Sequence, residues 1–161
     1  MKIVVPKETQ PGETRVALAP EVCKKLVKAG YAIAIESGAG SLAYYPDDAY
    51  REVGVVVESD PAALFGSADL VLSVNPPAIG GSAGRNEVAW MRPGTTILTS
   101  LMPLKNLDVV RALAERKVTS FSTDAIPRTT RAQAMDTLSS MASIRGYKGA
   151  LLAAAELPKY F

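Results

Sequence analysis

The sequence predicts an open, doubly wound α/β domain with a mostly parallel, flavodoxin-like sheet and right-handed crossovers. Short apolar, β-branched runs alternate with helical patterns along the chain, which is the βαβ rhythm of a parallel sheet. The runs are almost continuously apolar, as expected of strands covered on both faces. The length of 161 residues suits one domain with a sizeable core, so the chain is predicted to be a single domain over residues 1–161.

Six strands are expected at the apolar runs: Ile3–Val5, Ala32–Ile35, Val53–Val57, Leu70–Val74, Thr95–Thr99 and Val118–Phe121. Helices are expected where proline opens or glycine closes a periodic stretch, and at one further periodic segment: Pro20–Ala29, Pro46–Glu52, Pro61–Phe65 and Asn106–Lys117. A long helix over residues 131–157 is rich in alanine, serine and glycine, whose small side chains allow close packing against another domain. The Pro- and Gly-rich residues 76–84 are predicted to be a surface loop within the domain.

Composition excludes several classes of function. The net charge of +2 is too small to indicate nucleic-acid or anionic-membrane binding. The chain has no histidine, which excludes histidine-dependent triads and most zinc sites, and the single Cys23 supports neither a disulfide nor a metal site. A reducing, cytoplasmic setting fits this cysteine usage. No segment approaches the roughly 18 apolar residues of a membrane span, so any membrane association is expected to be peripheral and through a partner.

One motif resembles a dinucleotide fingerprint. Residues Gly38–Ala43 match G-x-G-x-x-A after a strand, with Glu58 near the distance of a ribose-binding acid. The fingerprint requires its glycines to open a helix, but Pro46 disfavours a helix through Tyr45 and marks a later helix start. We therefore interpret the motif as a glycine-rich turn.

Ligands of open α/β sheets bind beyond the carboxyl ends of the strands. Four loops there carry polar candidates: residues 6–15, 73–77, 100–103 and 124–128. In the first, Arg15 either clamps a carboxylate or phosphate, or pairs with Glu13 or Glu21 on the surface.

The segment from Arg128 to Ser140 is the most polar stretch before an apolar helix. Helical spacing would place Gln133, Asp136 and Ser140 on one face, just downstream of Arg128, where they offer donors and acceptors to an amide-bearing ligand. The alternative is a capping box from Thr130 to Gln133, in which the glutamine only satisfies a backbone donor. Periodicity alone favours the cap.

These residues resemble the N-terminal domain shared by alanine dehydrogenases and the alpha subunit of proton-translocating nicotinamide-nucleotide transhydrogenases. The resemblance covers nearly the whole chain, and its landmarks are Pro6–Glu8, Glu13–Ala17, Glu36–Gly40, Arg128–Ser140 and Gly146–Tyr147. In the transhydrogenase branch, it implies that Arg128, Gln133 and Asp136, with Ser139 as a neighbour, reach the nicotinamide of NAD(H). The resemblance thus favours the binding role of Gln133, with Thr130 still able to cap the helix, and it implies no metal.

The resemblance also separates the two branches. Alanine dehydrogenases use an arginine, a lysine and a histidine around their substrate, and only the arginine has a counterpart here, as Arg15. Ser73, Asn75 and Ser100 stand in the other loops, and Ser73 replaces a lysine common in transhydrogenases. Neither serine nor asparagine exchanges a proton near neutral pH, which disfavours amino-acid deamination. Hydride transfer between nicotinamides needs no such group, because the cofactors carry the chemistry.

The resemblance therefore implies a portion of a transhydrogenase alpha subunit that transfers hydride from NADH to NADP. Its partners would be an NADP(H)-binding component and a membrane subunit that translocates protons, and the full-length protein would be a homodimer. The Rossmann domain that binds most of NAD(H) in the family is absent from this chain, so the chain alone is expected to be inactive. The alternatives are an alanine dehydrogenase-type enzyme and a non-catalytic assembly module of the same fold.

Overall fold

The computed structural model describes residues 1–80 and 84–158. The chain forms two compact units, unit 1 (Met1–Ser122) and unit 2 (Thr123–Phe161). The central portion of the predicted loop over 76–84, residues 81–83, lies outside the described residues.

Unit 1 is built on one sheet in which all six strands are parallel. The strands are β1 (Lys2–Val5), β2 (Ala32–Glu36), β3 (Val56–Glu58), β4 (Leu70–Leu72), β5 (Thr96–Thr99) and β6 (Thr119–Ser122). The prediction of six strands in an open parallel α/β sheet is confirmed. The predicted start of the third strand at Val53 is wrong, because residues 53–55 turn out of the preceding helix through Gly54, whose φ is 85°.

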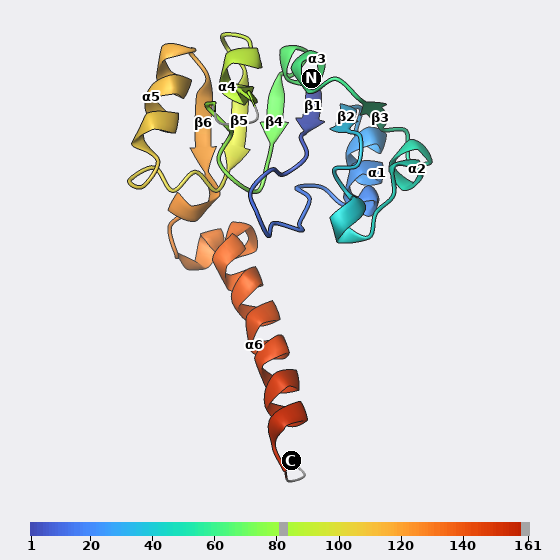
Figure 1. Ribbon diagram of the computed structural model, residues 1–161, viewed down its shortest axis with the longest axis vertical. Coiled ribbons are helices and arrows are strands. Elements are labelled where there is room, and N and C mark those ends of the chain that lie inside the picture. The colour runs from blue at the N-terminus through green and yellow to red at the C-terminus, as the bar shows by residue number, and fades with distance from the viewer. Residues whose placement is uncertain (81–83, 159–161) are drawn as a thin grey trace. The chain divides into compact units, whose positions relative to one another are not determined.

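The strands lie in the order β3-β2-β1-β4-β5-β6, which reads from right to left in Figure 1. In the flavodoxin order the third strand lies beside the first, whereas here β1 pairs with β2 and β4. After β3, helix α3 (Pro61–Gly66) packs into the core opposite that of α1 and α2, and the chain returns to the free side of β1. The order therefore reverses between β1 and β4, and crevices at such reversals are where open α/β sheets bind ligands.

Each face of the sheet carries its own core because alternate strand residues point to opposite faces. The first core joins the sheet to α1 (Pro20–Lys28) and α2 (Asp47–Arg51), and contains Ile3, Val5, Cys23, Ile33, Ile35, Ala39, Tyr50 and Val55. The second joins it to α3, α4 (Glu87–Trp90) and α5 (Leu107–Glu115), and contains Val4, Ala34, Leu64, Phe65, Ala68, Val71, Val88, Met91, Ile97, Leu101, Val109, Leu113 and Val118.

A portion of one sheet face is uncovered. Leu98 and Phe121 are register partners on β5 and β6, so they point to the same side of the sheet. Both side chains are exposed, Phe121 to 59%. Within the described residues, the helices of unit 1 thus leave an apolar strip of this face open to solvent.

The four helices predicted in unit 1 are all present, with ends that differ by up to three residues. Helix α4 was not predicted, because four residues are too few to show a helical period. Its cap is nevertheless visible in the structure: the side chain of Asn86 accepts a hydrogen bond from the Ala89 N–H at 3.0 Å.

The glycine-rich motif after β2 is a turn followed by a short 3₁₀ helix, Ser41–Ala43, as predicted. Gly40 lies so close to its neighbours that a Cβ there would be 2.6 Å from the Tyr45 carbonyl oxygen and 2.8 Å from the Tyr50 ring. Close packing in the first core therefore explains this glycine without a bound phosphate.

We expect Gly40→Ala to lower the free energy of unfolding by about 1–3 kcal/mol, because the added methyl group must push against backbone and a buried ring. Urea unfolding followed by circular dichroism measures the change. Gly66→Ala is the matched control, since its nearest neighbour would be 3.8 Å away, and it should change stability by less than about 1 kcal/mol. Equal effects of the two substitutions would contradict the packing explanation.

Unit 2 differs from the predicted long helix over 131–157. Residues Thr130–Met135 form a 3₁₀ helix (η3), and the α-helix α6 spans only Thr137–Glu156. The break lies at Asp136, whose backbone is extended and whose carboxylate accepts a hydrogen bond from the Leu138 N–H at 2.9 Å. An aspartate that caps the following helix cannot also continue the preceding one.

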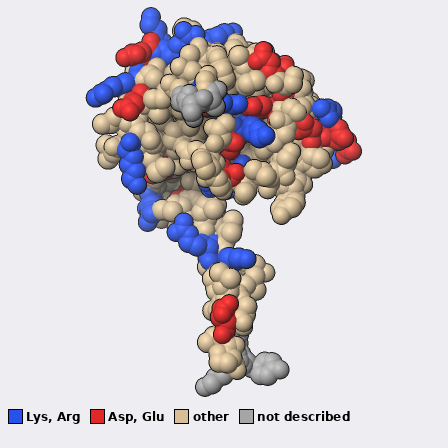
Figure 2. All heavy atoms as spheres, viewed as in Figure 1, with Lys and Arg blue, Asp and Glu red and all other residues tan. Residues whose placement is uncertain are grey.

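Helix α6 has no buried residue within the described chain. Its larger apolar side chains are exposed, among them Ile144, Tyr147, Leu151 and Leu152. Figure 2 shows few charged side chains on the face of this helix that is in view. Among the residues that the structure describes, no helix combines the length and apolarity needed to span a membrane.

Candidate functional site

At the β1/β4 reversal, Asn75 is the centre of a hydrogen-bond network. Its backbone N–H and side-chain Nδ2 both donate to Oε2 of Glu8, at 3.2 and 3.0 Å. Nδ2 also donates to Oε2 of Glu13 at 2.8 Å. The Asn75 carbonyl accepts hydrogen bonds from the hydroxyls of Ser73 (3.0 Å) and Thr99 (2.7 Å). The loops after β1 and β4 and the end of β5 are thereby joined.

Glu13 holds Arg15 with two hydrogen bonds. The Nε and Nη2 atoms of Arg15 donate to the two carboxylate oxygens of Glu13, each at 2.7 Å. Glu13 is largely buried, with 10% of its side chain exposed, while Arg15 is 47% exposed. Of the two surface partners considered for Arg15, the structure shows Glu13. The hydrogen bonds from Arg15 lower the pKa of Glu13 from 4.5 to about 2.

This shift predicts a pH-dependent contribution to stability. A carboxyl group whose pKa is depressed on folding stabilises the protein above its unfolded pKa of 4.5, and the contribution disappears as the pH falls to about 2. We expect Glu13→Gln to cost about 1–2 kcal/mol near neutral pH, less than the full shift because solvent screens the half-exposed guanidinium. Denaturant unfolding at neutral pH and at about pH 2 measures this. A cost that is the same at both pH values would contradict the assignment.

A second network lies at the end of β2. Arg85 donates from Nη1 and Nη2 to both carboxylate oxygens of Glu36, at 2.9 and 2.6 Å, and from Nε to Glu87 at 2.6 Å. Its guanidinium also lies 5.8 Å from the centre of the Trp90 ring. Burial raises the pKa of Glu87. One buried cation thus holds two buried carboxylates, which no local sequence pattern indicated.

The same carboxylates also bind backbone. Glu36 accepts a hydrogen bond from the Lys7 N–H at 2.8 Å, and Glu87 accepts one from the Ala78 N–H at 2.9 Å. Because Lys7 follows β1 and Ala78 follows β4, the Arg85 network ties the loops after three strands together. It gives the carboxyl edge of the sheet a rigid base.

The predicted site residues Arg128, Gln133, Asp136 and Ser139 all lie in unit 2. Asp136 is 7% exposed and accepts a hydrogen bond from the Ser139 hydroxyl at 2.6 Å. The Ser139 hydrogen bond, with backbone hydrogen bonds and the charge of Arg128, lowers the pKa of Asp136. Asp136 N–H donates to the Gln133 carbonyl at 3.3 Å. These contacts bring the four residues into one short segment.

The side chain of Gln133 is exposed, and no hydrogen bond to it is found within the described residues. The predicted capping box is wrong, because the residue at the N-terminus of η3 is Thr129 and it makes no side-chain cap. The predicted helical face shared by Gln133, Asp136 and Ser140 is also wrong, since Asp136 lies between two helices. The Gln133 carboxamide is therefore available to a ligand as both donor and acceptor.

Acid-base and metal chemistry have little support in the described residues. These residues contain no group of three or more His, Cys, Asp or Glu side chains placed to hold a metal ion. Burial raises the pKa of Cys23 to about 11, so this thiol is inert near neutral pH. Ser73, Asn75 and Ser100, at the ends of β4 and β5, carry no group that titrates near neutral pH.

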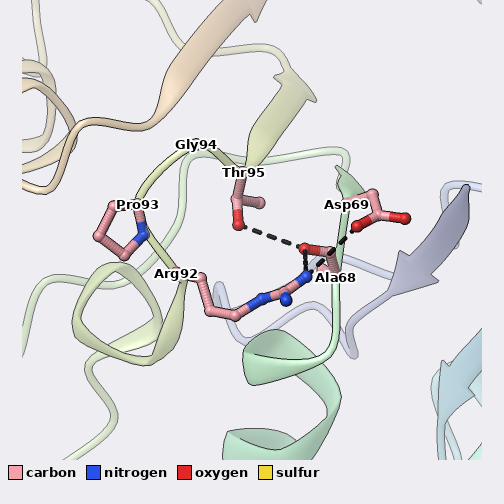
Figure 3. A pocket seen from close by; sticks show the side chains of 6 residues that line it. All are labelled: Ala68, Asp69, Arg92, Pro93, Gly94 and Thr95. Atoms are coloured by element: carbon pink, nitrogen blue, oxygen red, sulfur yellow. Dashed lines mark hydrogen bonds and ion pairs between the residues drawn. The ribbon is translucent and has the colours of Figure 1, made fainter.

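A cavity of about 200 Å³ lies at the opposite edge, by the amino ends of β4 and β5 (Figure 3). Its polar groups bind one another: Arg92 Nη2 donates to the Ala68 carbonyl at 3.0 Å and to Asp69 at 3.3 Å, and the Thr95 hydroxyl donates to the same carbonyl at 3.3 Å. These bonds connect neighbouring strand ends, so we assign the cavity a structural role.

Comparison with known proteins agrees with this geometry. Residues 4–145 match the protein family described as "Alanine dehydrogenase/PNT, N-terminal domain". The chain is 41% identical over all its 161 residues to an NAD(P) transhydrogenase subunit alpha chain of Rhodospirillum rubrum, covering 42% of that protein. It is 28% identical to alanine dehydrogenase 2 of Staphylococcus aureus over 99% of its length, covering 40% of that protein.

A solved structure of transhydrogenase from Sinorhizobium meliloti superposes on this chain with a TM-score of 0.87 at 34% identity. The match covers 99% of this chain and 46% of the other. The chain thus spans less than half the length of the relatives that it matches.

Proposed function

Because the chain belongs to the alanine dehydrogenase/PNT N-terminal domain family, we propose that it is a portion of the NAD(H)-binding alpha subunit of a proton-translocating NAD(P) transhydrogenase. The reaction would be hydride transfer from NADH to NADP, coupled to proton translocation by membrane partners. The higher identity to transhydrogenase than to alanine dehydrogenase supports this branch.

One observation carries the choice between the branches. The carboxyl edge of the sheet presents serine, threonine and asparagine from β4 and β5, and these side chains bond one another around Asn75. Deamination of an amino acid needs a proton-exchanging group at its carbon–nitrogen bond, and these side chains supply none. Hydride transfer between two nicotinamides requires alignment of the rings only.

Gln133 would orient the nicotinamide. Its exposed carboxamide can pair with the carboxamide of the nicotinamide, donating through Nε2 and accepting through Oε1. Asp136, fixed by Ser139, would keep the segment before α6 in place, and Arg128 would add a further donor beside it. When bound, NADH supplies the hydride, and this chain supplies orientation.

The remainder of the cofactor would be held by another domain. We propose that residues 1–161 are the N-terminal domain of the subunit and that α6 bridges to a Rossmann domain, which supplies most of the contacts to NAD(H). The exposed apolar side chains of α6 support this bridge, because such a helix is stable when other helices or domains cover it. The NADP-binding component and the membrane subunit would be separate partners, with the full-length protein a homodimer attached peripherally to the membrane.

A chimera tests the proposal. Residues 1–161 replace the matching segment of the Rhodospirillum rubrum relative, and the product is mixed with an NADP-binding transhydrogenase component. We expect transfer of hydride from NADH to an NADP analogue by the chimera, and none by the 161-residue chain alone. Formation of NADH that depends on L-alanine, without transfer to the NADP analogue, would favour the alanine dehydrogenase alternative. A folded chimera with neither activity would favour a non-catalytic module.

A further inference from the structure

The crevice at the β1/β4 reversal has its hydrogen-bond donors directed at internal acceptors. Both hydrogens of Asn75 Nδ2 go to carboxylates, one to Glu8 and one to Glu13. The backbone N–H of Val74 donates to Glu8 at 2.6 Å, and the Asn75 N–H donates to the same side chain. The hydroxyls of Ser73 and Thr99 donate to the Asn75 carbonyl.

The orientation of the Asn75 amide follows from its neighbours. An ionised carboxylate only accepts hydrogen bonds, so the amide must turn its nitrogen toward Glu8 and Glu13. The Asn75 side chain is then left with an acceptor, Oδ1, for any other molecule. A ligand that is itself only an acceptor gains nothing from this residue.

The charge in the crevice has the same effect. The carboxylates of Glu8 and Glu13 both act on the guanidinium of Arg15, so three charged groups give a net formal charge of −1. Asn75 contacts both carboxylates but contributes no charge. A small anion that enters therefore meets repulsion, and Arg15 already gives Nε and Nη2 to Glu13.

We propose that Asn75 is a specificity-determining residue that closes this crevice to small carboxylic acids. Its neutral amide satisfies two carboxylates with its only two donors and leaves their excess negative charge in place. A lysine at the same position has three donors and one positive charge, so it can bind both carboxylates, keep one donor for a ligand and bring the net charge to zero. The inference concerns unit 1 and goes beyond the nicotinamide contacts proposed for unit 2.

The test is a titration of the ¹⁵N-labelled chain with pyruvate, followed by amide chemical shifts. We expect no saturable binding by the wild-type chain. Asn75→Lys should bind pyruvate at least tenfold more tightly, a gain of about 1.4 kcal/mol. The gain should be absent with methyl pyruvate, which has the same carbonyl without the charge, and should be lost when Arg15→Ala is added.

Two further variants make the outcome decisive. Val22→Lys adds the same charge on the exposed side of α1 and should give no binding. Glu13→Gln removes one negative charge without altering Asn75 and should increase pyruvate affinity, which provides the test if Asn75→Lys does not fold. Saturable binding by the wild-type chain, equal gains from Val22→Lys, or no gain in a folded Asn75→Lys or Glu13→Gln variant would overturn the proposal. None of these results depends on hydride transfer, so the two proposals can fail separately.

Discussion

Replacing Arg85 by methionine is expected to lower the free energy of unfolding by about 3–5 kcal/mol. The substitution keeps most of the side-chain volume but leaves Glu36 and Glu87 without their cation in a largely buried site, where the Arg85 side chain is only 18% exposed. An uncompensated buried carboxylate costs far more than the loss of one surface ion pair. Urea unfolding of the 161-residue chain at neutral pH measures the difference.

Arg51→Met is the control for this experiment. Arg51 pairs with Asp48 at 2.6 Å on the surface of α2, and both side chains are exposed. Exposed pairs contribute about 0–1 kcal/mol, so this variant should stay close to the wild type. A loss for Arg85→Met no larger than for Arg51→Met would show that the Arg85 network does not stabilise the carboxyl edge.

Gln133→Ala should slow hydride transfer by about 10- to 100-fold in the chimera. Removal of the carboxamide leaves the nicotinamide without the group proposed to orient it, and small errors in ring placement are costly. The KM for NADH should change little, because most contacts to the cofactor are proposed to lie in another domain. Steady-state kinetics with NADH and an NADP analogue separates the effects on kcat and KM.

Gln10→Ala provides the matched control, since Gln10 is the other glutamine of the chain and is also exposed. It should transfer hydride at the wild-type rate. If Gln133→Ala is as active as Gln10→Ala, the proposed orientation of the nicotinamide by Gln133 is wrong.

The sheet could be predicted from sequence because its determinants are local. Each strand is a short apolar run, and proline or glycine marks most helix ends. The strand order could not be predicted, because it depends on which face α3 covers, and that is decided by packing between residues far apart in the sequence. A four-residue helix such as α4 is too short for a periodic signal.

The candidate site shows the same division. Arg128, Gln133, Asp136 and Ser139 lie within twelve consecutive positions, so their polarity was visible in the sequence. The helix break at Asp136 was missed, although an aspartate before an apolar stretch is a common N-cap and gives a usable signal. The pairing of Arg85 with Glu36 joins residues 49 positions apart and has no local signature. The bridging role of Asn75 likewise became visible only when the loops after β1 and β4 were seen together.

The central claim is that Gln133 contacts a nicotinamide held by a neighbouring domain, and side-chain amide NMR tests it most directly. The chimera, labelled with ¹⁵N at glutamine, is titrated with NADH and separately with ADP-ribose, which has the same nucleotide without the nicotinamide. We predict that the Gln133 side-chain signals shift with NADH and stay in place with ADP-ribose. Signals that respond equally to both ligands, or to neither when NADH is bound, would contradict the account.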